Sequence, residues 1–107
     1  FYVGHAPGRE HGFFNSFVTL NTRTGACTHT DVGENRYTSE ALFTPKARSK
    51  TQDDGYLLAV VYDASTHRSE IQIRDAQNPE DEIAAVLLEH HIPFGFHGHF
   101  TSDTFLQ

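Results

Sequence analysis

Residues 92–100, IPFGFHGHF, place two histidines among phenylalanines and glycines. His97 and His99 are two positions apart, so in an extended chain both imidazoles lie on one face and in principle reach one metal ion. Each phenylalanine favours burial by roughly 1.5–3 kcal/mol, and a buried imidazole needs a polar or metallic partner. Gly95 and Gly98 let the backbone pass close to another group. No Asp or Cys stands within this stretch, so a metal site would need ligands from distant parts of the chain.

Eight histidines are many for 107 residues, but the other six do not share a pattern that favours a metal site. Adjacent His90 and His91 point to opposite faces of an extended chain and cannot easily share one ion. The remaining four are expected at the surface, three in polar loops and one between threonines of a strand: His5, His11, His67 and His29.

Other reaction centres find no support in the sequence. It contains no GxSxG elbow, no P-loop and no GxGxxG motif. Cys27 is the single cysteine; it has no local activating context, excludes an internal disulfide and fits a reducing compartment. The QDDG segment at 52–55 lacks the further acidic ligands that calcium requires, so we interpret it as a hairpin turn.

Composition sets the class of protein. A net charge of −6 and a pI of about 5.7 argue against nucleic acid as a partner, because phosphates call for a basic face. A chain of 107 residues allows one domain with a modest core, and no apolar run approaches the roughly 20 residues of a spanning helix. We therefore expect a cytoplasmic protein. The chain opens mid-pattern and has no methionine, which suggests a piece of a longer protein.

Strand patterns dominate the chain. Residues 13–21 and 26–33 flank a turn at Gly25 and predict a hairpin. Residues 40–45 predict a short extended segment, and the unbroken apolar run at 56–63 predicts a strand covered on both faces. Several short strands separated by turns at intervals of about 10 to 15 residues suit a sandwich, a barrel or propeller blades.

Two later segments need separate interpretation. Residues 69–76 alternate cleanly, with Ile71 and Ile73 on one face and three polar residues on the other, which predicts a half-exposed strand. Residues 78–91 carry conflicting signals. Asn78 and the following proline and acids favour a helix, whereas the alternative is a capped turn at 78–81 followed by a strand at about 82–88. The polar residues of the first segment are Glu70, Gln72 and Arg74.

The chain carries four separated motifs: SEALFTP at 39–45, QDDGYLLAVVYD at 52–63, SEIQIRDA at 69–76 and HHIPFGFHGHF at 90–100. In this order they resemble the C-terminal end of the carotenoid cleavage oxygenase family, which includes carotenoid, apocarotenoid and stilbene dioxygenases and the retinal pigment epithelium isomerase. The resemblance covers roughly residues 13–100. Two departures are minor: Ala41 replaces the usual proline and Gln52 replaces an acid. The resemblance also favours the strand at 82–88 over the helix.

The resemblance implies a seven-bladed β-propeller, in which residues 1–107 would supply about two blades of a single, incomplete domain. It implies one Fe(2+) on the axis, bound by four histidines, of which His97 is the last and the other three lie outside this chain. Glu40 corresponds to the glutamate that accepts a hydrogen bond from a ligand imidazole; which imidazole stays open. A dry pocket for an apolar polyene or stilbene would be lined by Phe94, Phe96 and Phe100, for which core packing is the alternative.

The implied reaction is oxidative cleavage of a conjugated C=C bond of a carotenoid, apocarotenoid or stilbene with O2, giving two carbonyl products. The metal carries this chemistry, so no catalytic acid or base is assigned. Two alternatives stay open: an isomerase-type member with the same iron site, and an inactive propeller fragment. We expect the isolated chain to be inactive and poorly soluble, because one ligand cannot hold iron and open sheet edges invite pairing. Peripheral membrane contact through segments outside the chain also stays open.

Overall fold

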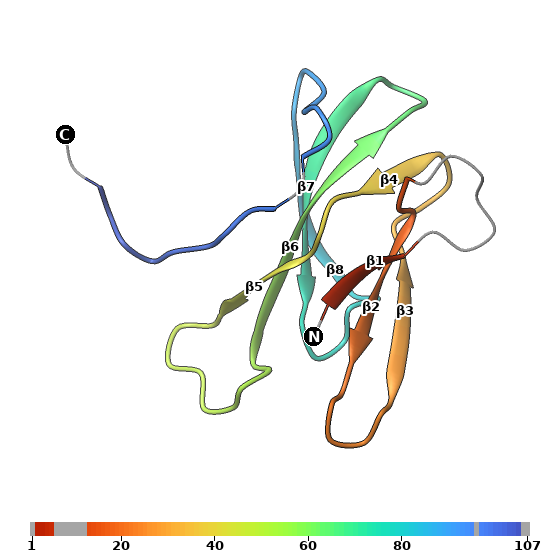
Figure 1. Ribbon diagram of the computed structural model, residues 1–107. Coiled ribbons are helices and arrows are strands. Elements are labelled where there is room, and N and C mark those ends of the chain that lie inside the picture. The colour runs from red at the N-terminus through yellow and green to blue at the C-terminus, as the bar shows by residue number, and fades with distance from the viewer. Residues whose placement is uncertain (1, 6–12, 96, 106–107) are drawn as a thin grey trace.

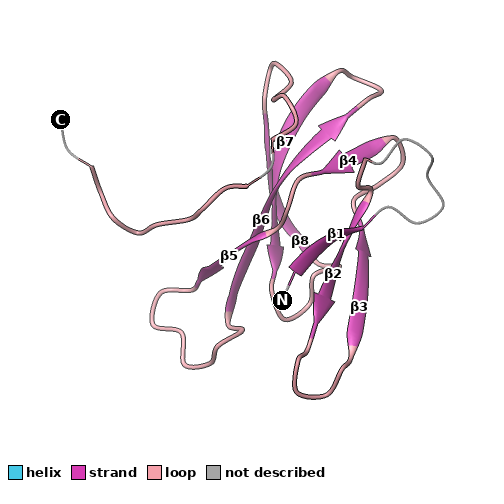
Figure 2. Ribbon diagram, viewed as in Figure 1, coloured by secondary structure: helices cyan, strands magenta, loops and turns pink. Residues whose placement is uncertain are grey.

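The computed structural model of the chain describes residues 2–5, 13–95 and 97–105. All regular elements of this described part are β-strands (Figure 2), which confirms the all-β prediction. The strands form two antiparallel sheets, one of order β1-β2-β3 and one of order β4-β6-β7-β8 in which β5 also pairs with β6. The strands are β1 (Tyr2–His5), β2 (Ser16–Leu20), β3 (Cys27–Asp31), β4 (Arg36–Thr38), β5 (Leu42–Pro45), β6 (Gly55–Asp63), β7 (Arg68–Asp75) and β8 (Glu82–Leu87).

The predicted hairpin is present as β2 and β3, which lie side by side in Figure 1. Its turn closes through Gly25, whose amide donates to the Asn21 carbonyl at 2.8 Å. Gly25 has a φ of +74°, a conformation that glycine adopts without the steric cost other residues meet. Phe17 of β2 is fully buried, so the hairpin packs its apolar side into the core.

The core lies on one face of the five-stranded sheet, where Phe17 of β2 meets alternate residues of β6. These β6 residues are almost completely buried, whereas the residues between them are half-buried. The prediction that 56–63 is a strand covered on both faces is therefore correct for one face and only partly so for the other. The buried set is Leu57, Ala59 and Val61, and the half-buried set is Leu58, Val60 and Tyr62.

The half-exposed strand predicted at 69–76 is present as β7, but its polar side is the buried one. The polar residues of β7 are buried, with Gln72 fully so, while Ile71 and Ile73 stay partly exposed. The register explains this, because the polar residues pair with the buried residues of β6 and so share their face. The pairs are Val61 with Glu70, Ala59 with Gln72 and Leu57 with Arg74.

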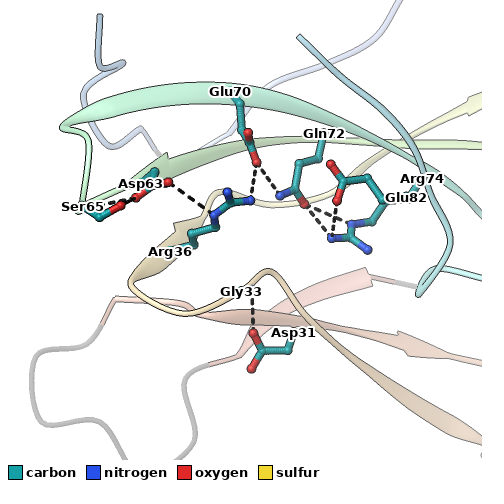
Figure 3. Close-up of polar contacts among 9 residues, drawn as sticks. All are labelled: Asp31, Gly33, Arg36, Asp63, Ser65, Glu70, Gln72, Arg74 and Glu82. Atoms are coloured by element: carbon teal, nitrogen blue, oxygen red, sulfur yellow. Dashed lines mark hydrogen bonds and ion pairs between the residues drawn. The ribbon is translucent and has the colours of Figure 1, made fainter. Parts of the chain in front are cut away.

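The buried polar row is stable because its members bond one another (Figure 3). Gln72 Nε2 donates to Glu70 Oε1 at 2.7 Å, and Arg74 donates to Gln72 Oε1 from Nε at 3.1 Å and from Nη2 at 2.9 Å. Arg36 of β4 pairs with Glu70 at 2.9 Å, and Arg74 Nη1 donates to the Pro79 carbonyl at 3.0 Å. Burial of charge is tolerated where it is paired and hydrogen-bonded, and an alternation rule does not reveal such pairing.

The conflict at 78–91 is resolved in favour of the strand. Residues 78–81 form a turn in which the Asp81 amide donates to the Asn78 carbonyl at 2.9 Å, and β8 then pairs with β7. Pairing with a neighbouring strand satisfies the backbone, so tertiary context overrides the local helix preference. The exposed fraction of Leu87 on this edge strand is 75%. None of the described segments is a helix long and apolar enough to cross a membrane.

Candidate functional site

Glu40 lies where the strand that borders β6 is interrupted. Thr38 pairs with Val61 and Leu42 with Leu58, so three residues (39–41) stand opposite two (59–60). One extra residue on one strand is a β-bulge, a feature that re-aims a side chain out of the regular alternation. The bulge therefore frees Glu40 from the ladder and lets its carboxylate reach the C-terminal segment.

The Glu40 carboxylate binds two groups of that segment. Oε2 lies 3.2 Å from His97 Nδ1, and Oε1 accepts the Gly98 amide at 2.6 Å. Within the described residues, the imidazole that Glu40 contacts is therefore that of His97. A Cβ at Gly98 would lie 3.3 Å from Leu42 Cδ1, so the predicted close approach holds here, whereas Gly95 has no neighbour within 4 Å of such a Cβ.

These contacts favour the ionised form of Glu40. The Gly98 amide and then the His97 ring lower the pKa of Glu40 from its ordinary value of 4.5, and desolvation opposes them only in part. An ionised carboxylate only accepts hydrogen bonds, so Nδ1 of His97 is the donor. In the neutral ring Nε2 then carries the free lone pair, which is the atom a metal would take. The His97 side chain is 86% exposed.

The segment that carries His97 is attached to the sheet at its start. The Ile92 amide donates to Ser69 Oγ at 2.8 Å, and the Ser69 amide donates to the His90 carbonyl at 3.0 Å. Phe94 stacks on Phe13 with ring centroids 4.6 Å apart. Beyond His97 the described chain has no regular structure and extends away past β5 (Figure 1).

A pocket of about 340 Å³ lies between this segment and the half-buried face of the five-stranded sheet. Its wall is mostly apolar, and both Glu40 and His97 belong to it. Phe94 is in the wall of this pocket, whereas Phe100 is not among the lining residues and is 41% exposed. Phe96 lies outside the described residues. The sheet contributes Leu58, Val60, Tyr62 and Ile71.

Sequence reasoning missed these sheet residues as a pocket wall. The sequence contained part of the signal for this wall, because even-numbered positions of a strand at 56–63 share one face. That Ile71 lies opposite Val60 is known only from the register. Sequence reasoning also missed Ser39, whose hydroxyl accepts the Val60 amide at 3.1 Å, and it named Gly98 for close backbone approach without the amide that Glu40 binds. Backbone hydrogen bonds of this kind leave no mark in residue type.

Among the residues that the structure describes, the remaining histidines do not form a metal cluster. Within the described part of the chain, no group of three or more His, Cys, Asp or Glu side chains is arranged to hold a metal ion. His67 is exposed, as predicted; it bonds the Tyr62 hydroxyl at 2.7 Å and stacks on His91 at 4.8 Å between centroids. His29 is exposed too, and His11 lies outside the described residues.

Comparison with known proteins identifies relatives for nearly the whole chain. Residues 1–102 match the family described as RPE65, retinal pigment epithelial membrane protein. A carotenoid 9,10(9',10')-cleavage dioxygenase from Crocus sativus is 41% identical over 80 residues, which cover 72% of this chain and 15% of that protein. The apocarotenoid-15,15'-oxygenase of Synechocystis is 33% identical over 97 residues, covering 90% of this chain and 19% of that protein. The chain thus spans less than a fifth of the length of these relatives.

Solved structures agree with the fold. A variant of the Synechocystis apocarotenoid oxygenase aligns with a TM-score of 0.84 at 31% identity, over 94% of this chain and 21% of that chain. A cobalt-substituted form of the same oxygenase gives a TM-score of 0.82 at 31% identity, over 92% and 20% of the two chains. A chimera of the oxygenase with RPE65 gives 0.84 at 28% identity, over 95% and 22%.

Proposed function

The chain belongs to the family of RPE65 and the carotenoid cleavage dioxygenases, and from this premise we propose that it is part of a non-haem iron(II) dioxygenase. In this proposal His97 is a metal ligand, Glu40 orients it, and the pocket beside them receives an apolar substrate. The observation that carries the proposal is the Glu40 carboxylate, which accepts hydrogen bonds from His97 Nδ1 and the Gly98 amide at one end of an apolar pocket.

The residues fit an iron ion on chemical grounds. Imidazole is a ligand that suits iron, and a metal-bound histidine usually donates a hydrogen bond from its other ring N–H to a carboxylate. Glu40 holds the proton on Nδ1 and so keeps the Nε2 lone pair available. Iron in such a site supplies the activation of O2. The cobalt substitution described for the Synechocystis oxygenase supports a metal centre in this family.

One imidazole is not a complete site. We infer that the chain forms about two blades at the C-terminal end of a seven-bladed propeller, and that three further histidines come from the rest of the protein. The exposed apolar side chains of the edge strand β8 support this inference, because Ile83 and Val86 are each 49% exposed and Leu87 more so. Large apolar residues on both faces of an edge strand are normally packed against another part of the protein.

The pocket supports an apolar substrate. Its wall combines aliphatic residues of β6 and β7 with Phe94 and Tyr62, and such walls exclude water and favour conjugated hydrocarbon. The names of the relatives favour a carotenoid or apocarotenoid, cleaved at a C=C bond with O2 to two carbonyl products. An isomerase-type activity is the second candidate, because the family that the chain resembles also includes the retinal pigment epithelium isomerase.

The test compares two histidines of the full-length protein. His97→Ala removes the proposed ligand, and His99→Ala is the matched control, because both residues are exposed in the same segment. We expect His97→Ala to lose bound iron and cleavage of an apocarotenoid, with His99→Ala close to wild type in both. Equal iron content in wild type and His97→Ala contradicts the ligand role. Iron binding with double-bond isomerisation of the apocarotenoid and no cleavage selects the isomerase.

A further inference from the structure

Ser39 is the first residue of the bulge at 39–41 and stands directly before Glu40. Its side-chain hydroxyl takes the place of a backbone carbonyl as the acceptor of one ladder hydrogen bond. The Ser39 amide donates to the Val60 carbonyl at 2.9 Å, as in any sheet. The returning bond is different, because the Val60 amide donates to Ser39 Oγ at 3.1 Å instead of to a carbonyl. A buried amide without a partner is costly, so the hydroxyl keeps the bulge compatible with the sheet.

The backbone around Ser39 explains why a hydroxyl is needed. The Ser39 carbonyl accepts the Thr38 hydroxyl at 2.8 Å, while the amide of Val60 is served by the serine side chain. Ser39 Oγ in turn donates to the Glu40 carbonyl at 3.2 Å. A hydroxyl has one donor and two acceptor lone pairs, so this one atom connects the β6 ladder with the peptide group of Glu40.

From these contacts we propose that Ser39 is a positioning residue, which holds the backbone of Glu40 so that its carboxylate meets His97 Nδ1 and the Gly98 amide. The proposal rests on the proposed function, since it concerns the orientation of the suggested ligand. Ser39 reaches the imidazole only through Glu40. Its hydroxyl fixes the peptide from which the Glu40 side chain projects, and the 2.6 Å contact with Gly98 tolerates little displacement.

The proposal predicts how substitutions at position 39 rank. Alanine lacks both hydrogen-bonding capacities, so the Val60 amide loses its partner and the Glu40 peptide is released. Threonine keeps the hydroxyl and, as a β-branched residue, suits an extended backbone. Cysteine keeps a weak donor and acceptor and falls between them. Thr44→Ala is the control for sheet stability, because Thr44 is buried on β5 and pairs with Tyr56, away from Glu40.

The experiment uses the full-length protein and two readouts. Hydrogen exchange of the Gly98 amide, measured on the metal-free protein, reports the Glu40 contact without any iron. Competition with a chelator measures the Fe(2+) affinity. In Ser39→Ala we expect Gly98 exchange to rise about three- to tenfold, as for the loss of one hydrogen bond, and iron affinity to fall by a similar factor. Ser39→Thr should stay within about twofold of wild type in both.

The outcomes separate this inference from the proposed function. Unchanged Gly98 exchange in both Ser39→Ala and Ser39→Cys overturns the positioning role, and so does a Thr44→Ala variant that raises Gly98 exchange equally. A wild-type protein that binds no iron refutes the proposed function. Gly98 exchange that still follows the order Ala, Cys, Thr at position 39 in that protein supports the positioning of Glu40 independently.

Discussion

Replacing Glu40 by glutamine tests the metal-site geometry with a nearly isosteric change. Glutamine keeps one acceptor oxygen, which can still take the Gly98 amide held by Glu40 at 2.6 Å. Its NH2 group then faces His97 Nδ1, where the carboxylate now lies at 3.2 Å. Two donors cannot share that contact, so the ring is driven to the tautomer with the proton on Nε2. The lone pair proposed to bind iron is thereby removed.

The magnitude follows from the same contacts. A hydrogen bond to a charged group contributes about 1.5–3 kcal/mol, and the Glu40 side chain is about one-third exposed, which favours the lower end. Loss of an imidazole-orienting carboxylate typically weakens metal binding 10- to 100-fold, or about 1.4–2.7 kcal/mol. We therefore expect Glu40→Gln to bind Fe(2+) about tenfold more weakly in a chelator competition on the full-length protein. Wild-type affinity in this variant would refute the orienting role of Glu40.

Three further predictions concern the sheet and acid sensitivity. Gly55→Ala should disrupt the β5–β6 pairing and lower the midpoint of urea unfolding, because the added Cβ would meet the carbonyl of Thr44 and the ring of Phe43 within 2.6 Å. Gln72→Leu should destabilise the protein by about 3 kcal/mol, because it removes the acceptor of two hydrogen bonds that a buried arginine donates. Below pH 4.5 the Gly98 amide should lose protection from exchange. The pKa of Glu40 in the folded protein is lowered from 4.5, so the contact of its ionised carboxylate contributes full stability above pH 4.5. That contribution is lost as the pH falls through the folded pKa.

Each of these predictions has a control within the chain. Gly95→Ala adds a Cβ with no atom within 4 Å and should leave the unfolding midpoint unchanged; an equal effect of both glycine variants contradicts the steric argument. Gln77→Leu changes an exposed glutamine and should cost little stability, so a loss as large as that of Gln72→Leu argues against the buried network. Acid sensitivity of Gly98 exchange that persists in Glu40→Gln would assign it to another carboxyl group.

The positions of several strands and the turn of the first hairpin were predictable because they depend on local patterns, whereas β1 and β4 were not predicted. Gly25 marks the turn of the first hairpin, and the apolar run at 56–63 forms the central strand β6. At 82–88 the local pattern favoured a helix, and only the resemblance to a known family indicated the strand that the structure contains. Pairing with β7 determines that segment, and a partner strand is not visible in a short window of sequence.

Burial was harder to predict than the positions of the strands. Gln72 is fully buried because Glu70 and Arg74 satisfy its amide from the same face of β7, and alternation alone assigns such residues to solvent. The contact between Glu40 and His97 joins residues 57 positions apart through a bulge whose extra residue appears only in the register. Residue types could suggest the two partners, but the fold alone brings them together.

The most direct test of the account locates the metal in the full-length protein. Diffraction data recorded at the iron absorption edge should give one anomalous peak at bonding distance from Nε2 of His97. Nδ1 of the same ring should be hydrogen-bonded to Glu40. A peak that lies away from this ring, or an Nε2 atom that contacts only solvent in an iron-loaded crystal, would contradict the central claim.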